Sequence, residues 1–418
     1  MIKGTEKAPA IRFRGFTDDW EQRKLGEMAE SFQYGLNAAA KKYDGKNKYI
    51  RITDIDDLSH EFSQSNLTSP DTDISQADNY RLNEGNILFA RTGASVGKTY
   101  IYKHSDGRVY YAGFLIRAKL FKEYDSEFVF QNTLTSKYKR FIQITSQRSG
   151  QPGVNAQEYE NYGLMVPSLK EQKGIGNLLA NLDNLITLHQ HKLEQQKKLK
   201  KYFLQNMFPE EGETVPRIRF KGFTGDWEQR KLGDISSVID PHPSHRAPVE
   251  TQTGIPFIGI GDVDEAGNVD YSTARIVDEK IYEEHHKRYD LAIPSVGIGR
   301  VASLGKVIRL RNDIGKYAVS PTMSIIQFSQ EVDVNYMYSC MSSPYFQQQF
   351  TAQSSGSTRQ SVGIQDLRRF MIPIPQNKIE QINIGMFFWK LDNLITRHQR
   401  KIDQLQAMKK FMLQNLFV

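Results

Sequence analysis

One glycine-rich stretch of the chain has residue types that bind phosphate groups in many proteins. Gly93-Ala-Ser-Val-Gly-Lys-Thr99 resembles a Walker A loop, but that loop has four residues between its glycines and this one has three. A stretch of the second half, Pro294 to Arg300, keeps glycines and a basic residue without the Gly-Lys-Thr. We therefore regard the resemblance as accidental and interpret both stretches as glycine turns that bring backbone and a cation close to a polyanion. The candidate contacts are Arg91, Thr92, Lys98 and Arg300, and a plain structural turn is the alternative.

Two polar loops form a second candidate binding set. They begin Thr-x-Gln-x-Ser-Gly at residues 145–150 and 351–356. Arginine and glutamine can pair with guanine and adenine edges through two hydrogen bonds each, so such loops suit DNA recognition. Polar loops also simply face solvent, which is the alternative. The candidate side chains are Gln147, Arg148, Gln151, Ser357, Thr358, Arg359 and Gln360.

Three short patterns that could indicate catalysis or metal binding are incomplete. Asp240-Pro-His-Pro243 lacks the aromatic residue on which an adenine methyltransferase stacks its flipped base, and no glycine-rich cofactor strand accompanies it. His242 and His245 have no further ligand at a recognisable spacing, and the neighbouring prolines indicate a surface turn. Asp278-Glu-Lys280 has the form of half a nuclease motif without its preceding element. The sequence thus predicts no catalytic residue, no metal site and no cofactor in this chain.

Composition narrows the class of protein. The 418 residues carry a net charge of +7, which modestly favours a polyanionic partner. Mean hydropathy is −0.55, no apolar run is long enough to span a bilayer, and the first residues lack a secretory signal. The single cysteine, Cys340, excludes an intramolecular disulfide framework. We expect a cytoplasmic protein of at least two domains that does not associate with membranes.

The chain repeats itself with a period of half its length. Residues 11–26 return as 218–233 with fourteen of sixteen positions identical, and residues 182–190 return as 391–399 with one change. The two kinds of block alternate along the chain. If the pattern continued past residue 418, the next block would be the one that begins at residue 11. The repeat is therefore circular, and the termini should lie close together in a pseudo-two-fold molecule.

Two long stretches have the periodicity of amphipathic helices. Apolar positions recur at steps of three or four from Glu171 to Phe208 and again in the C-terminal segment, without an internal proline. The two apolar stripes can pack together, and His189 and His398 are expected to pair in that core rather than bind a metal. The lysine pairs at 197–198, 200–201 and 409–410 are interpreted as a solvated helix face, and contact with DNA phosphates is the alternative. The stripe residues that we select are Leu182, Leu185, His189, Leu193, Leu391, Ile395, His398 and Ile402.

The stretches between the repeated blocks, residues 29–165 and 236–374, are predicted to be mixed α/β domains. Strand-type runs occur at 86–89, 110–120 and 323–328, and helical patterns cover 127–144 and 334–350. We therefore divide the chain into an N-terminal conserved segment at 1–18, a first domain at 19–165, a helical spacer at 166–209, a linker at 210–225, a second domain at 226–374 and a C-terminal helical spacer at 375–418.

Four features recur in the same order in both halves. They are Trp-Glu-Gln-Arg-Lys-Leu-Gly, the Ser-Gly loop, a proline turn followed by Glu171-Gln172 or Glu380-Gln381, and the Leu-Asp-Asn-Leu-Ile helix. In this order and duplication the chain resembles, over nearly its whole length, the specificity subunit of type I restriction-modification systems. The resemblance implies an α/β (mixed α+β) fold in which two target recognition domains alternate with two helical regions that pack as an antiparallel coiled coil.

The same resemblance implies partners. They are double-stranded DNA, two methyltransferase subunits that dock on the helical spacer, and restriction subunits that are ATP-driven translocases and nucleases. S-adenosylmethionine, ATP and magnesium would then belong to the partner subunits.

We favour a non-catalytic DNA sequence-specificity subunit. Two unlike recognition domains on a stiff spacer would read a split, asymmetric target and direct the partners to it. One alternative is a standalone methyltransferase or nuclease, which the incomplete motifs disfavour. The other is a structural coiled-coil adaptor for proteins, which the basic charge and the duplicated polar loops disfavour.

Overall fold

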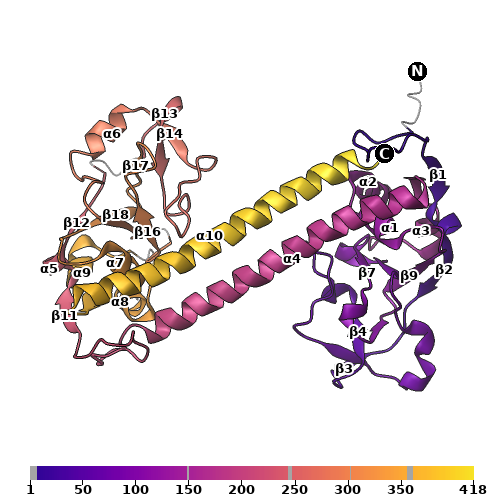
Figure 1. The fold of residues 1–418 in the computed structure, drawn as a ribbon, viewed down its shortest axis with the longest axis horizontal. Coiled ribbons are helices and arrows are strands. Elements are labelled where there is room, and N and C mark those ends of the chain that lie inside the picture. Colours follow the sequence, from indigo (N-terminus) through magenta and orange to yellow (C-terminus); the bar gives the residue numbers. More distant parts are fainter. Residues whose placement is uncertain (1–6, 148–149, 243–246, 302, 355–360) are drawn as a thin grey trace. The chain divides into compact units, whose positions relative to one another are not determined.

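The computed structural model describes residues 7–147, 150–242, 247–301, 303–354 and 361–418. The chain forms two units: unit 1 contains residues up to 188 together with 402–418, and unit 2 contains residues 189–401. Two long helices, α4 (Leu169–Asn206) and α10 (Lys378–Asn415), each contribute to both units (Figure 1). Each helix has 38 residues, or roughly 57 Å at 1.5 Å per residue.

Unit 1 is built around an antiparallel sheet with the strand order β2-β9-β6-β7. Shorter pairs flank it: β4 with β8, β3 with β5, and β1 with β10. The strands are β1 (Glu21–Lys24), β2 (Ala29–Tyr34), β3 (Ala40–Lys42), β4 (Lys48–Ile50), β5 (Thr68–Pro70), β6 (Ile87–Ala90), β7 (Thr99–Ile101), β8 (Val109–Tyr111), β9 (Leu115–Leu120) and β10 (Gly163–Val166). The short helices are α1 (Ser126–Asn132), α2 (Ser136–Thr145) and α3 (Ala156–Glu160).

Unit 2 has the same central arrangement, an antiparallel sheet with the order β12-β18-β15-β16. A second sheet, β14-β13-β17, and the pair β11-β19 complete it. The strands are β11 (Glu228–Lys231), β12 (Ser236–Ile239), β13 (Glu250–Ile258), β14 (Arg275–Val277), β15 (Ser295–Gly299), β16 (Val307–Leu310), β17 (Ala318–Val319), β18 (Met323–Phe328) and β19 (Met371–Ile374). The helices are α5 (Leu232–Ile235), α6 (Lys280–His285), α7 (Val334–Met341), α8 (Pro344–Ser354) and α9 (Ile364–Arg369).

The helical patterns predicted at 127–144 and 334–350 are each two helices rather than one. The breaks lie between α1 and α2 and between α7 and α8. Thr135 caps the start of α2 by accepting from the Tyr138 amide, and Pro344 begins α8, a position where its missing amide costs nothing. The predicted strands at 86–89 and 323–328 are confirmed as β6 and β18, whereas the run at 110–120 divides into β8 and β9.

The repeated blocks build the same frame in each unit. Trp20 and Trp227 are both 2% exposed. Arg12 forms two hydrogen bonds to the buried Glu171, and Arg219 forms two to the buried Glu380. The sequence identity of the two blocks therefore reflects one packing solution used twice.

The circular repeat is confirmed within unit 1. The Ile11 amide donates to the Asn415 carbonyl at the end of α10, over 2.9 Å. In unit 2 the Ile218 amide donates to the Asn206 carbonyl at the end of α4, over 2.8 Å. The last helix thus meets the first conserved block through the same contact that the continuous chain makes in the middle.

The helix packing corrects one stripe residue. Leu182, Leu193, Leu391, Ile395 and Ile402 are all buried, as predicted. Leu185, however, is 43% exposed, and Ile186 is buried in its place because the helix advances by four residues there. The predicted pairing of His189 with His398 is confirmed, since their Nδ1 atoms lie 2.9 Å apart.

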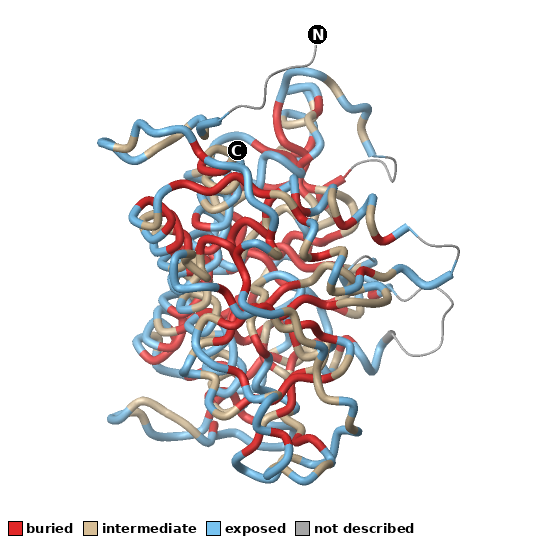
Figure 2. Tube along the Cα trace, turned by 90° about the vertical axis from the view of Figure 1, so that its right-hand side faces the viewer, coloured by how far each residue is buried: buried red, intermediate tan, exposed pale blue. Residues whose placement is uncertain are grey.

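Buried residues occur along the central strands and on part of each long helix. Figure 2 colours the chain by burial, with buried residues in red. Each unit has a large apolar core in which its tryptophan packs beside residues of the long helices. Among the described residues, no helix is both long and apolar enough to cross a membrane.

Candidate nucleic-acid interface

Arg91 and Arg300 occupy equivalent positions directly after the inner strands β6 and β15. The Arg91 amide donates to the Phe114 carbonyl, and its carbonyl accepts from the Val154 amide, over 3.0 and 2.9 Å. The Arg300 amide donates to Thr322, and its carbonyl accepts from Val362, over 2.9 and 3.2 Å. Because the four backbone bonds match, the two arginines begin the same loop in both units.

The counterpart of the glycine turn at 93–99 is not the stretch from Pro294 to Arg300. Gly297 and Gly299 lie inside β15 and are buried. The true counterpart is Ser303-Leu-Gly-Lys306, which repeats Ser95-Val-Gly-Lys98. Lys98 and Lys306 each donate their amide to the serine carbonyl three residues earlier, over 3.0 Å in both. The repeated Ser-x-Gly-Lys was a sequence signal that could have identified Lys306.

The loop at 93–99 has different neighbouring elements from a Walker A loop. A Walker A loop leads into a helix, whereas this one leads into strand β7. The Thr99 hydroxyl is buried against that of Thr133, 2.7 Å away. Lys98 Nζ donates to the Ile55 carbonyl over 3.0 Å and forms an ion pair with Asp57. Lys306 Nζ likewise donates to the Ile260 carbonyl. The loop therefore shares residue types with a Walker A loop but not its place before a helix.

The two candidate sets of the first domain lie side by side. Thr92 forms an isolated β-bridge with Gly153, and the Gly93 amide donates to the Pro152 carbonyl over 3.0 Å. Gln147 and Gln151 are exposed on the neighbouring Ser-Gly loop. The structure thus brings together Arg91, Thr92 and Gln151, which the sequence placed about sixty residues apart. Arg148 and residues Ser357, Thr358, Arg359 and Gln360 lie outside the described residues.

The two arginines have different surroundings. The Arg91 guanidinium lies 4.8 Å from the ring centre of Tyr34, which is 40% exposed. The Arg300 guanidinium forms an ion pair with Asp240 over 3.3 Å, and its side chain is 15% exposed. Arg91 and Tyr34 together present a cation and an accessible ring, two groups that suit phosphate and base contacts. Sequence patterns alone did not indicate Tyr34.

A short hairpin receives the Lys98 side chain. Ile55 and Phe62 form its bridge, and the Asp56 carboxylate accepts backbone amides within the turn. The Ser59 amide, followed by that of Leu58, lowers the Asp56 pKa against the opposing effect of burial. This carboxylate is therefore ionised at neutral pH and holds the turn that Lys98 contacts.

His242 does not lie on a surface turn, contrary to the sequence interpretation. It is 6% exposed, and its ring lies 4.5 Å from the ring of the buried His285. Burial, followed by the neighbouring His242, lowers the His285 pKa to about 4. His245 lies outside the described residues. Over the part of the chain that the structure describes, no three His, Cys, Asp or Glu side chains are grouped so as to hold a metal ion.

Two of the lysines assigned to a solvated helix face are largely buried. Lys200 pairs with Asp392 over 2.6 Å, and Lys409 pairs with Asp183 over 2.5 Å. Both lysine side chains are about 15% exposed. Both aspartates belong to the repeated Leu-Asp-Asn-Leu-Ile block. In each unit the aspartate of one long helix therefore pairs with a lysine of the other long helix.

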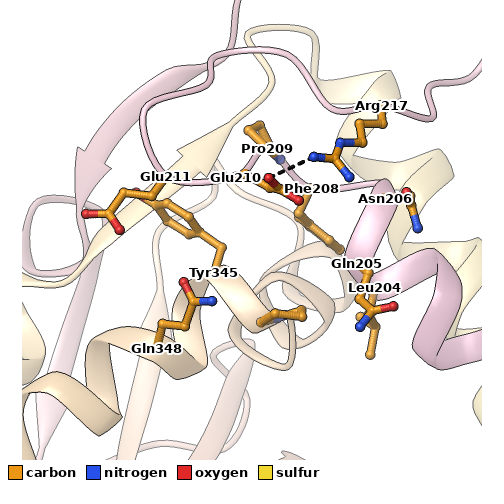
Figure 3. A pocket seen from close by; sticks show the side chains of 11 residues that line it. Leu204, Gln205, Asn206, Phe208, Pro209, Glu210, Glu211, Arg217, Tyr345 and Gln348 are labelled. Atoms are coloured by element: carbon orange, nitrogen blue, oxygen red, sulfur yellow. Dashed lines mark ion pairs between the residues drawn. The ribbon is translucent and has the colours of Figure 1, made fainter.

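A cavity of about 540 Å³ lies at the linker in unit 2, apart from the candidate DNA contacts (Figure 3). Glu210 and Arg217 form an ion pair at its edge over 2.8 Å. Tyr345 and Gln348 of α8 line the opposite side. All of its lining residues belong to unit 2, and they come from the end of α4, the linker and α8.

Comparison with known proteins gives the same assignment for both halves. The chain matches the family described as the type I restriction modification DNA specificity domain twice, over residues 17–198 and 224–407. Two proteins of Methanocaldococcus jannaschii are similar along nearly their whole length. One relative, assigned as the type I restriction enzyme MjaX specificity subunit, is 23% identical over 408 residues. The match covers 94% of this chain and 91% of the relative. The type I restriction enzyme MjaVIII specificity subunit is 21% identical over 403 residues, with the same coverage.

A solved structure shares the fold. The crystal structure of the type I restriction-modification S subunit from M. genitalium matches with a TM-score of 0.68 at 13% identity. The match covers 98% of this chain and 99% of that one. The fold and both domain matches thus define a DNA specificity protein with two related halves. This chain belongs to the type I restriction-modification specificity family, and the resemblance drawn from its sequence is confirmed.

Proposed function

We propose that this chain reads a split, asymmetric DNA sequence and places methyltransferase and restriction subunits on it, without catalysing a reaction itself. The observation that carries the proposal is that the two units have one sheet order and one loop position for Arg91 and Arg300, but different groups around each arginine. A shared frame with unlike surfaces suits two unlike half-sites.

In this proposal the chemistry belongs to the partners. Adenine methylation requires the base to leave the stack and enter an enzyme's pocket, so the subunit's part is to position two such pockets on the duplex. S-adenosylmethionine would be bound by two methyltransferase subunits that dock on α4 and α10, and ATP and magnesium by the restriction subunits. The exposed apolar side chains that the two helices share at matching positions support such docking: Leu185 with Leu394, Leu199 with Met408, and Tyr202 with Phe411.

The experiment is to co-express the chain with a candidate methyltransferase subunit and to map methylated adenines across a genome by single-molecule sequencing. A split motif supports the proposal and names both half-sites. No motif from a stable complex would favour the protein adaptor.

A matched insertion tests the spacer. Four residues added to each long helix at the unit boundary extend it by about 6 Å and rotate it by about 40°. These changes correspond to about one or two base pairs of duplex. We expect a longer gap with both half-sites unchanged, and an unaltered gap would refute the spacer role.

A further inference from the structure

One buried carboxylate in unit 2 connects three elements. Asp392 of α10 has no exposed side-chain surface. It accepts a hydrogen bond from Nη1 of Arg309 over 2.7 Å and pairs with Lys200 Nζ over 2.6 Å. Arg309 lies on strand β16 of the recognition domain, and Lys200 lies on α4. The domain's sheet and both helices therefore meet at one aspartate.

Unit 1 has an equivalent of Asp392, but its recognition domain has no equivalent of Arg309. Asp183 pairs with Lys409 over 2.5 Å, and it accepts from Gln131 Nε2 of α1 over 2.7 Å. The sheet position equivalent to Arg309 is Ile101, because Ile101 pairs with Ile87 as Arg309 pairs with Val296. Aspartate and lysine are thus common to both units, whereas each recognition domain supplies its own donor from a different element.

The Arg309 side chain is held from several sides. Its guanidinium lies 3.5 Å from the ring centre of Tyr338, and Nη1 also donates to the Glu265 carbonyl. The preceding residue, Asp264, lies in a hairpin closed by the bridge between Val263 and Val269, and it pairs with Arg400 of α10 over 3.2 Å. The hairpin, the sheet and α7 all meet the helix through this cluster.

Lys200 remains charged in this cluster. Burial alone would lower its pKa, but Tyr338 and Asp392 raise it, and the net change is upward. Asp392 therefore faces two cations, one from the opposite helix and one from the domain. Such a buried pair adds little stability compared with apolar residues, but its directional hydrogen bonds admit few orientations.

We propose that Asp183 and Asp392 are orientation locks, each fixing the angle at which its recognition domain is held on the helix pair, with Gln131 and Arg309 as the positioning residues specific to each domain. This inference rests on the proposed function, since the orientation matters only if both domains must engage DNA at once. It implies that discrimination of gap length depends on these residues, although they contact no base.

The test uses the full chain with its methyltransferase subunits and compares Arg309→Met with Arg311→Met. Arg311 is two residues away, and its side chain is 34% exposed. It bonds to Asp313 and to Asn268 of the hairpin, so its loss removes the same charge but leaves the contacts of Asp392 in place. In R309M we expect methylation of the native-gap target to fall on the order of tenfold relative to targets whose gap is one base pair longer or shorter. R311M should keep the wild-type preference.

A second readout does not need DNA. Spin labels at Glu284→Cys on α6 and Lys390→Cys on α10 report the orientation of the domain on the helix, and the native Cys340 is buried and will not be labelled. We expect a broader distance distribution in R309M than in R311M or the wild type. If R309M does not fold, Arg309→Lys, which keeps the charge but not the directional hydrogen bonds of the guanidinium, takes its place with the same expectation.

The two readouts separate the two proposals. An unchanged distance distribution in the folded Arg309 variant overturns the orientation lock, whatever the methylation result. A wild-type complex that methylates no split target overturns the proposed function, while the spin-label comparison still decides the lock.

Discussion

His189 Nδ1 lies 2.9 Å from His398 Nδ1, across two helices whose sequences repeat at a displacement of 209 residues. One of the two nitrogens must donate and the other must accept, so at least one imidazole is neutral in this arrangement. Burial, followed by the neighbouring His189, lowers the pKa of His398. Protonation of both imidazoles would remove this hydrogen bond, so the contact is stable at neutral pH and is weakened by acid.

Acid should weaken the folded state through this pair. Because the folded pKa of His398 is below its ordinary value near 6.5, the unfolded chain binds more protons below that pH. The stabilisation is therefore complete above about pH 6.5 and is lost as the pH falls towards the folded pKa. When the pH is lowered from about 7.5 to about 5.5, the melting temperature of the double variant H189L/H398L should fall less than that of the wild type. His191→Leu, an exposed position on the same helix, is the control, and a wild-type acid response in the double variant would contradict the argument.

The buried pair between Arg219 and Glu380 should be far more sensitive than the exposed pair between Arg217 and Glu210. Glu380 is 1% exposed, so Arg219→Met leaves a carboxylate buried without its cation, at a cost of about 3 kcal/mol in the free energy of unfolding. Arg217 and Glu210 are more than half exposed, and Arg217→Met should cost less than about 1 kcal/mol. Chemical denaturation measures both. The double variant R219M/E380M should recover part of the loss, and equal effects of the two single variants would contradict the packing assignment.

Gly385 is required by close packing rather than by backbone conformation. An added Cβ would lie 2.5 Å from Asp333 Oδ1 and 2.6 Å from the Tyr336 amide nitrogen, where α10 crosses the start of α7. Alanine favours a helix by about 1 kcal/mol, but the clash should outweigh this and give a net loss of about 2 kcal/mol. Gly174→Ala is the control, since its nearest neighbour is the end of the Phe13 ring at 3.3 Å. A G385A variant as stable as wild type would show that the helices separate easily there.

Arg91 should contribute to reading one half-site only. We expect Arg91→Ala to weaken binding to the first half-site by about 1–3 kcal/mol, or about 5- to 150-fold, if its guanidinium contacts a base edge. Arg140→Ala, an exposed arginine of α2, removes the same net charge and controls for general attraction to DNA. The measurement is methylation of targets altered in one half-site at a time. Equal losses from both variants would assign Arg91 a non-specific role.

The adjacent ends of unit 1 predict a functional circular permutant. Joining Val418 to Met1 through a short linker and opening the chain at residues 209–216 should preserve folding, because the Ile11 to Asn415 contact already matches the Ile218 to Asn206 contact. Circular dichroism and methylation by the complex would both remain close to wild type. A permutant that does not fold would show that the intact linker is needed for folding and does not only connect the two halves.

The repeated frame was predictable because its information is local. Helical periodicity, prolines and near-identical blocks located α4, α10, the circular repeat and the family, and two copies of one block fold alike. The repeated Ser-x-Gly-Lys sequence was also visible. Comparing the glycines alone, however, matched residues 93–99 with 294–300 instead of matching 95–98 with 303–306. Leu185 was misplaced for a related reason, since steps of three and four both satisfy a helical pattern and only the partner helix selects one.

The state of each charged residue was decided by the tertiary structure. Lys200 meets Asp392 across 192 residues of sequence, Arg300 meets Asp240 across sixty, and Lys98 meets Ile55 across forty-three. Whether a cation is free for DNA depends on which carboxylate or carbonyl the fold brings within about 3 Å, and that distance is set by packing between distant segments. The sequence by itself determined the frame and the class of protein, whereas the fold determined which side chains of that frame are held inside and which remain exposed to bind.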